Sequence, residues 1–101
     1  MRKRFETWKE FRKELNLTPE EEEEIQLEMD IIKATIEARK KQKLSQEELS
    51  KKTGLKQPSI ARIENGKISP TTNTLIKILY PMGYTLKVVP LDKIEQFRDS
   101  T

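Results

Sequence analysis

The sequence contains no cysteine and no histidine among its 101 residues. Disulfides, thiol nucleophiles, Cys/His zinc sites and the commonest general base are therefore excluded. No apolar run approaches the roughly 18 residues of a membrane-spanning helix, and no charged-then-apolar signal segment opens the chain. We therefore expect a cytoplasmic protein that needs no cofactor, and we predict that it is not an enzyme.

Apolar residues are also scarce. Leu, Ile, Val and Phe make up 25 of the 101 residues, whereas 37% of all residues are charged. This apolar share lies only a little above the roughly 20% below which disorder is expected. Because the length allows a single hydrophobic core, we expect one small compact domain with thin ends.

The net charge of +3 hides an uneven distribution of charges along the chain. Residues 18–30 carry seven acidic groups and no basic one, whereas residues 31–82 carry eleven basic and four acidic groups. A basic block of this density suits a phosphate backbone, and an acidic block would be repelled by it. The acidic block is therefore expected to face something other than nucleic acid. The alternative is that both blocks are ordinary solvated helix faces.

Two helices are predicted before the basic block. The first is short, because its apolar stripe recurs at three- and four-residue steps over only a few turns: Phe5, Trp8, Phe11 and Leu15. Thr18-Pro19-Glu20-Glu21 is typical of a helix start, with a capping hydroxyl, a proline in the first turn and carboxylates at the positive end of the dipole. The second helix is expected to run to about Lys43, with a break near Met29 left open.

Three further helices are predicted in the basic block. Ser45 and Glu48 form the pattern of a capping box, and Gly54 is expected to end the helix that they start. The next helix carries Pro58 in its first turn and stops at Asn65-Gly66. Thr71 or Thr72 caps the last helix. Its buried side is predicted to comprise Leu75, Ile76, Ile78, Leu79 and Met82.

One β-strand is predicted over residues 84–89, which alternate, are rich in β-branched residues and end at Pro90. A lone strand leaves its backbone groups unpaired, so it needs a partner from outside the chain. Either a second copy pairs with it through Tyr84, Leu86 and Val88, or another protein's sheet does. The alternative is an extended segment that packs on the helices.

Two short helices joined by a glycine-containing turn form the helix-turn-helix pattern. The segments Ser45-Gln46-x-x-Leu49-Ser50, Gly54-Leu55-Lys56-Gln57 and Ser59-Ile60-x-x-Ile63-Glu64-Asn65-Gly66-Lys67 resemble the XRE-type family of phage repressors and Cro. The resemblance covers about residues 31–82 and implies an all-α fold with five helices. It also implies a structural ion pair between Arg39 and Glu64. Lys56 departs from the family, which usually carries Ser or Thr at this helix cap.

The helix from Gln57 to Asn65 is expected to enter the major groove of DNA with its N-terminal end first. A glutamine amide can pair with adenine and an arginine fork with guanine, so Gln57 and Arg62 are the predicted base readers, supported by Lys56 and Ser59. Gln46 is expected to hold a phosphate. Contacts on the opposite side of the groove are predicted for Asn65, Lys67, Ser69 and Thr71. For each residue the alternative is ordinary surface polarity.

The chain is thus predicted to have an N-terminal extension (1–30), a helix-turn-helix domain (31–82) and a C-terminal strand and tail (83–101). This layout, together with Pro58, resembles HigA-type antitoxins. The resemblance implies a homodimer that represses its own operon at a palindromic operator and neutralises a basic mRNA-cleaving toxin in a heterotetramer. Aromatic anchors and complementary charge suit such a contact, and the candidate residues are Phe5, Trp8, Phe11, Glu20, Glu21 and Glu24.

Three alternatives remain open at this point. The chain could be a stand-alone XRE-type repressor whose flanks serve only dimerisation. It could also be an interaction protein with a vestigial helix-turn-helix. Finally, the aromatic stripe could pack on the protein's own long helix instead of on a partner.

Overall fold

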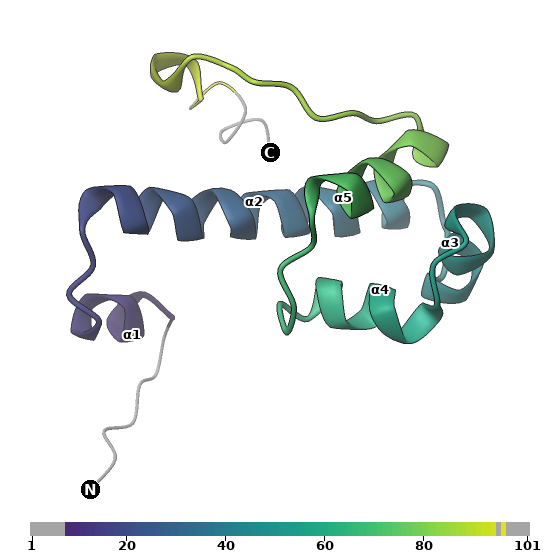
Figure 1. The fold of residues 1–101 in the computed structure, drawn as a ribbon, viewed down its shortest axis with the longest axis horizontal. Helices are drawn as coiled ribbons and strands as arrows, with labels where there is room; N and C mark the ends of the chain where they lie inside the picture. The colour runs from purple at the N-terminus through teal and green to yellow at the C-terminus, as the bar shows by residue number, and fades with distance from the viewer. Residues whose placement is uncertain (1–7, 95, 97–101) are drawn as a thin grey trace, which may run out of the picture.

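The structure, a computed structural model, describes residues 8–94 and 96. Within these residues the fold is entirely helical (Figure 1). The elements are α1 (Trp8–Glu14), α2 (Pro19–Lys41), α3 (Gln46–Thr53), α4 (Gln57–Glu64), α5 (Thr72–Leu79) and the 3-10 turns η1 (Tyr80–Met82) and η2 (Leu91–Lys93). None of the helices in the described ranges combines the length and the hydropathy that crossing a bilayer would require.

The predicted helix starts are confirmed. Ser45 and Glu48 form a complete capping box, in which the Glu48 N–H donates to Ser45 Oγ and the Ser45 N–H donates to Glu48 Oε1, each at 3.0 Å. Thr18 caps α2 in the same way. For α5 the capping residue is Thr71, whose Oγ1 accepts from the Thr74 N–H at 3.2 Å. Each of these starts satisfies backbone N–H groups that no helical carbonyl can reach.

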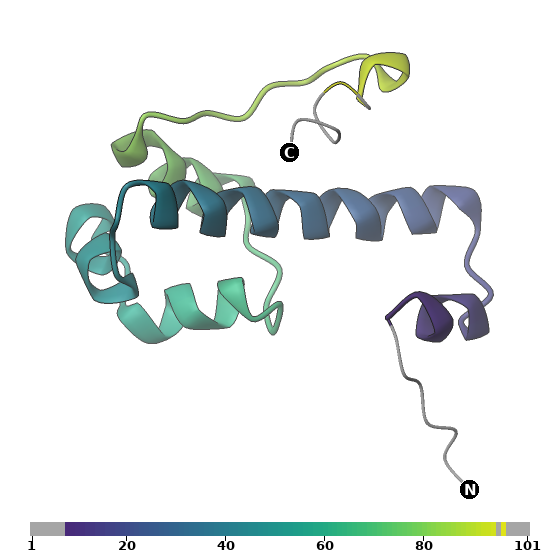
Figure 2. The ribbon, with the colours of Figure 1, turned by 180° about the vertical axis from the view of Figure 1, so that it is seen from behind.

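The long helix α2 is continuous over its 23 residues, without a break near Met29. Its buried residues, Thr35 and Ala38, both lie in its C-terminal half. The N-terminal half extends beyond the other helices, and α1 lies near the far end of it, on the same side of α2 as α4 (Figures 1 and 2). The first turn of the acidic block therefore lies away from the core, whereas Glu24 and Glu28 border a hollow that Pro70 and Leu75 also line.

The core lies among α2, α3, α4, α5 and η1. Leu49 is 0% exposed, and Ile60 and Ile78 are each 1% exposed. The same cluster contains Ala38, Ile63, Leu79 and Met82, and Leu75 is also buried. Burial of a single large aliphatic side chain contributes about 1.5–3 kcal/mol, so this small cluster is the main source of stability.

The prediction that Ile76 is buried is wrong, since this side chain is 45% exposed. Leu75, Ile78, Leu79 and Met82 follow one another at steps of three, one and three residues and are buried. Ile76 lies on the flank of this stripe, outside the arc that one helix can turn toward a core.

The prediction of a β-strand over residues 84–89 is also wrong, because the described part of the chain contains no strand. The segment runs as an extended trace beside α2 (Figure 1). Leu86 packs against the core, whereas Val88 is 96% exposed, so the two do not share one face as the alternation predicted. A strand exists only with a ladder partner, and residues 8–94 and 96 of a single copy supply none. The extended segment packed on the helices, left open as the alternative, is what the structure has.

Candidate nucleic-acid interface

Helices α3 and α4 form the predicted helix-turn-helix. Gly54 ends α3 in the left-handed conformation, at a φ of 79°, and Ser50 Oγ donates to the Leu55 carbonyl across the turn. In α4 the inner residues Ile60 and Ile63 are buried, as predicted, while Arg62 is exposed. The core thus holds one side of α4, and the opposite side is left accessible.

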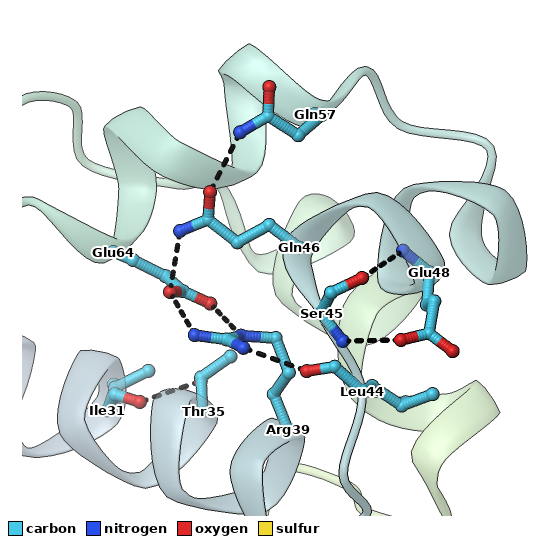
Figure 3. A network of polar contacts seen from close by, with 9 residues as sticks. All are labelled: Ile31, Thr35, Arg39, Leu44, Ser45, Gln46, Glu48, Gln57 and Glu64. Atoms are coloured by element: carbon cyan, nitrogen blue, oxygen red, sulfur yellow. Dashed lines mark hydrogen bonds and ion pairs between the residues drawn. The ribbon is translucent and has the colours of Figure 1, made fainter.

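A bidentate ion pair ties α4 to α2. Arg39 Nε donates to Glu64 Oε2 at 2.7 Å, and Arg39 Nη2 donates to Glu64 Oε1 at 2.9 Å (Figure 3). Arg39 Nη1 also donates to the Leu44 carbonyl at 2.8 Å. The side chains of Arg39 and Glu64 are only 12% and 7% exposed. The structure therefore brings together the two residues that the family resemblance pairs, in the fork geometry that suits arginine and a carboxylate.

The ion pair shifts the titration of both groups. The hydrogen bond to Glu64 raises the pKa of Arg39 above its ordinary value. Burial by itself would raise the pKa of Glu64, but the hydrogen bonds from Arg39 and Gln46 outweigh it, so the pKa of this carboxyl lies below its ordinary value. Both shifts favour the charged pair in the folded state.

Two half-buried glutamines extend the hydrogen-bond network of this ion pair toward the surface. Gln46 Nε2 donates to Glu64 Oε1 at 3.0 Å, and Gln57 Nε2 donates to Gln46 Oε1 at 2.8 Å (Figure 3). Gln46 is the first residue of α3 and Gln57 the first of α4, and both are half-buried. The predicted phosphate contact and the predicted base reader are therefore hydrogen-bonded to each other.

The other candidate DNA contacts lie around α4. Lys56 is the N-cap residue of α4 and makes no side-chain capping bond. Lys56, Arg62, Asn65 and Lys67 are exposed, and Ser59 is half-buried. The backbone turns sharply after α4 at Gly66, where the Lys67 N–H donates to the Arg62 carbonyl at 2.9 Å. This turn places Asn65 and Lys67 at the C-terminal end of α4, away from Lys56 at its start.

Besides Gln46 and Gln57, two more of the predicted contacts have partners within the chain. Ser69 Oγ donates to the carboxylate of Glu28, and Thr71 caps α5. Sequence reasoning did not include Glu28 in this region, because it lies 41 residues before Ser69 and on another element. No local pattern signals such a contact, since only the packing of α2 beside the α4–α5 loop creates it.

The candidate partner contacts lie at the other end of α2. Glu20, Glu21 and Glu24 are exposed, and Phe11 of α1 is half-buried. Phe5 and the side chain of Trp8 lie outside the described residues. Further along α2, an open hollow of about 410 Å³ lies against the end of α4, and its apolar lining includes Met29, Ile32 and Ile36.

Comparison with known proteins defines the class. A model of the helix-turn-helix family matches residues 36–88. An uncharacterized HTH-type transcriptional regulator of Haemophilus influenzae is 43% identical over 84 residues, which cover 83% of this chain and 85% of the relative. The chain therefore belongs to the helix-turn-helix family, a class of DNA-binding transcriptional regulators and not of enzymes.

A solved structure is similar over most of the chain. It is described as a toxin–antitoxin module from Streptococcus pneumoniae, with a TM-score of 0.65 and 42% sequence identity. The match covers 87% of this chain and 97% of the other. Because the family model spans only residues 36–88, this likeness extends into the flanks of the helix-turn-helix.

Proposed function

We propose that this protein is the antitoxin of a type II toxin–antitoxin pair. In this role it binds and neutralises a small basic mRNA-cleaving toxin and represses its own operon as a homodimer. The observation that carries the proposal is the likeness to a toxin–antitoxin module over 87% of the chain, at 42% identity. A likeness of this extent includes parts of the chain that a helix-turn-helix alone does not need.

The charge distribution supports separate binding surfaces at the two ends of the molecule, one for the toxin and one for DNA. The exposed carboxylates Glu20, Glu21 and Glu24 lie on the part of α2 that projects from the core. An acidic surface of this kind is complementary to the RNA-binding groove of a basic ribonuclease. Phe5, Trp8 and Phe11 are the proposed apolar anchors.

The opposite end of the molecule is the proposed DNA-binding surface. There α4 enters the major groove, Gln57 and Arg62 read bases, and Lys56 and Ser59 support them. Gln46 has one amide N–H that is not used by Glu64, and this N–H is available for a phosphate. The proposed backbone contacts across the groove are Asn65, Lys67, Ser69 and Thr71.

Dimerisation is proposed to use the C-terminal segment. Tyr84 and Val88 are 41% and 96% exposed, whereas Leu86 holds the segment on the core. A twofold dimer would bind an inverted repeat whose half-sites lie about 10 bp apart, or a multiple of that distance.

The test is co-expression with the product of the adjacent open reading frame. Expression of that product alone should arrest growth, and co-expression with the wild-type chain should restore it and yield a stable complex. The triple variant Glu20→Gln, Glu21→Gln, Glu24→Gln should fail to restore growth. The matched control, Arg62→Ala, should restore growth but lose operator binding in a gel shift.

The second candidate, a stand-alone XRE-type repressor, is favoured by the relative described as a transcriptional regulator. It predicts that the chain remains a free dimer when it is co-expressed with the neighbouring product, and that this product does not arrest growth. Either of these results would refute the antitoxin proposal while leaving the DNA-binding surface intact.

A further inference from the structure

We infer that Glu64 is a positioning residue that sets the direction in which the Gln57 amide faces DNA, acting through Gln46. The inference rests on the proposed reading of bases by α4. It adds a role for a residue that does not itself reach the groove, since the side chain of Glu64 is only 7% exposed.

The first step of the argument is the carboxylate. An ionised carboxylate can only accept hydrogen bonds, and the ion pair with Arg39 keeps Glu64 ionised. Gln46 must therefore turn its NH₂ group toward Glu64, as the 3.0 Å bond from Gln46 Nε2 to Glu64 Oε1 shows. This orientation leaves the carbonyl oxygen of Gln46 facing the other way.

The second step concerns Gln57, whose amide orientation is set by the carbonyl oxygen of Gln46. A carbonyl oxygen can only accept, so Gln57 must in turn present its NH₂ group, and Gln57 Nε2 lies 2.8 Å from Gln46 Oε1 (Figure 3). If the Gln57 amide flipped, two carbonyl oxygens would face each other and the bond would be lost. Glu64 thus determines the orientation of an amide with which it has no direct contact.

The orientation leaves a defined set of groups on Gln57. Its Oε1 remains free to accept, and its Nε2 keeps one N–H to donate. Adenine presents a donor at N6 and an acceptor at N7 in the major groove, which matches this pair in one register only. A Gln57 amide free to flip would lose part of its preference for adenine over the other bases.

The experiment selects binding sites from a pool of randomised DNA duplexes and then measures affinities for single-base-pair variants of the selected site by fluorescence anisotropy. Gln57→Ala identifies the base pair that Gln57 reads. At that base pair, Gln46→Leu and Glu64→Gln should each lower the preference by about tenfold. Preferences at the other base pairs should stay as in the wild type.

Two features separate positioning from a merely structural role. Gln46→Leu leaves the ion pair between Arg39 and Glu64 intact, so it tests the relay in a domain that keeps its core. Arg39→Lys is the matched control, because it weakens the ion pair but keeps the carboxylate that orients Gln46. Its base preference should equal that of the wild type even where its melting temperature is lower.

The inference is overturned if Gln46→Leu and Glu64→Gln keep the wild-type preference at the Gln57 base pair, whatever happens to their overall affinity. It is also overturned if Arg39→Lys loses that preference to the same extent as Glu64→Gln. If the wild type selects no sequence at all, the proposed DNA reading itself fails, and the inference fails with it.

Discussion

At the scale of single residues, Glu64 links the stability of the domain to pH. Its pKa is lower in the folded chain than the ordinary value of 4.5, because Arg39 and Gln46 donate to its carboxylate. A carboxyl with a lowered pKa stabilises the fold fully above its ordinary pKa, and this stabilisation is lost as the pH falls through the folded value.

The first prediction concerns Glu64→Gln. At pH 7 this variant should have a free energy of unfolding about 1–3 kcal/mol lower than the wild type, since hydrogen bonds to a charged group are lost. The difference should shrink as the pH falls below about 4.5. Urea unfolding at pH 7, 5, 4 and 3 measures it, and Glu47→Gln on the exposed side of α3 is the control. A difference that stays constant with pH would contradict the prediction.

The second prediction concerns Lys43, which follows the C-cap residue Gln42 of α2 and has a φ of 57°. A side chain in this left-handed conformation is strained, and glycine adopts it without strain. Lys43→Gly should therefore raise the stability by about 0.5–1 kcal/mol, seen as a melting temperature several degrees higher.

The control for Lys43→Gly is Lys41→Gly, which removes the same charge from the last turn of α2. Glycine within a helix lowers the stability by about 0.5–1 kcal/mol, so the two variants should move in opposite directions. A fall in melting temperature for both would show that the left-handed position is not strained in solution.

At the scale of elements, α4 lacks a side-chain cap at its N-terminus, where it has the exposed lysine Lys56 instead. Lys56 occupies its N-cap position without a side-chain hydrogen bond, although Ser, Thr or Asp would provide one. The helix is held instead by Ile60 and Ile63, which are buried in the core. The residue at this position therefore suits the proposed contact with DNA more than the stability of the helix.

The third prediction is that Lys56→Ser raises the stability of the domain and lowers its affinity for DNA. A capping hydroxyl should stabilise the domain by about 0.5–1 kcal/mol in thermal unfolding. Loss of a phosphate contact should weaken binding to all sequences alike and lower the slope of log affinity against log salt by about one. Lys93→Ser in η2 removes an equal charge far along the chain and should change neither quantity. An unchanged salt slope for Lys56→Ser would place Lys56 away from the phosphates.

The local elements were predictable where four or five adjacent residues decide them. The helix caps at Thr18 and Ser45 and the left-handed Gly54 are of this kind, because each satisfies backbone groups within one helical turn. Ile76 was wrongly predicted to be buried because it is apolar, although it lies on the exposed side of α5. The strand over residues 84–89 was misplaced because β-propensity supplies no ladder partner.

At the scale of the whole molecule, the two charged regions lie at opposite ends of α2. The acidic residues near its N-terminus project from the core, while its C-terminal half packs against α4 (Figure 1). This separation is what allows one chain to be proposed both as a DNA-binding protein and as a partner of a basic protein. A hydrogen bond from Ser69 to Glu28 connects the acidic block to the loop between α4 and α5.

The fourth prediction concerns the proposed dimer. Val88→Asp should leave the thermal unfolding of the monomer unchanged, because this side chain is 96% exposed in the single chain. It should nevertheless shift the protein from dimer to monomer in light scattering coupled to size-exclusion chromatography, since a charge would be buried in the interface. Lys87→Ser is the neighbouring control and should remain dimeric. A dimer that survives Val88→Asp would move the interface to another surface.

The helices, their caps and the family could be predicted from the sequence, because these follow from residues close together along the chain. The contacts of Gln46 with Gln57 and of Glu28 with Ser69 follow only from the tertiary structure, whereas the family resemblance already paired Arg39 with Glu64. The tertiary structure also decided that Leu86 and Val88 face different surroundings. The reason is physical: a cap needs only its own helical turn, whereas a hydrogen bond between two helices depends on how all the helices pack around one core.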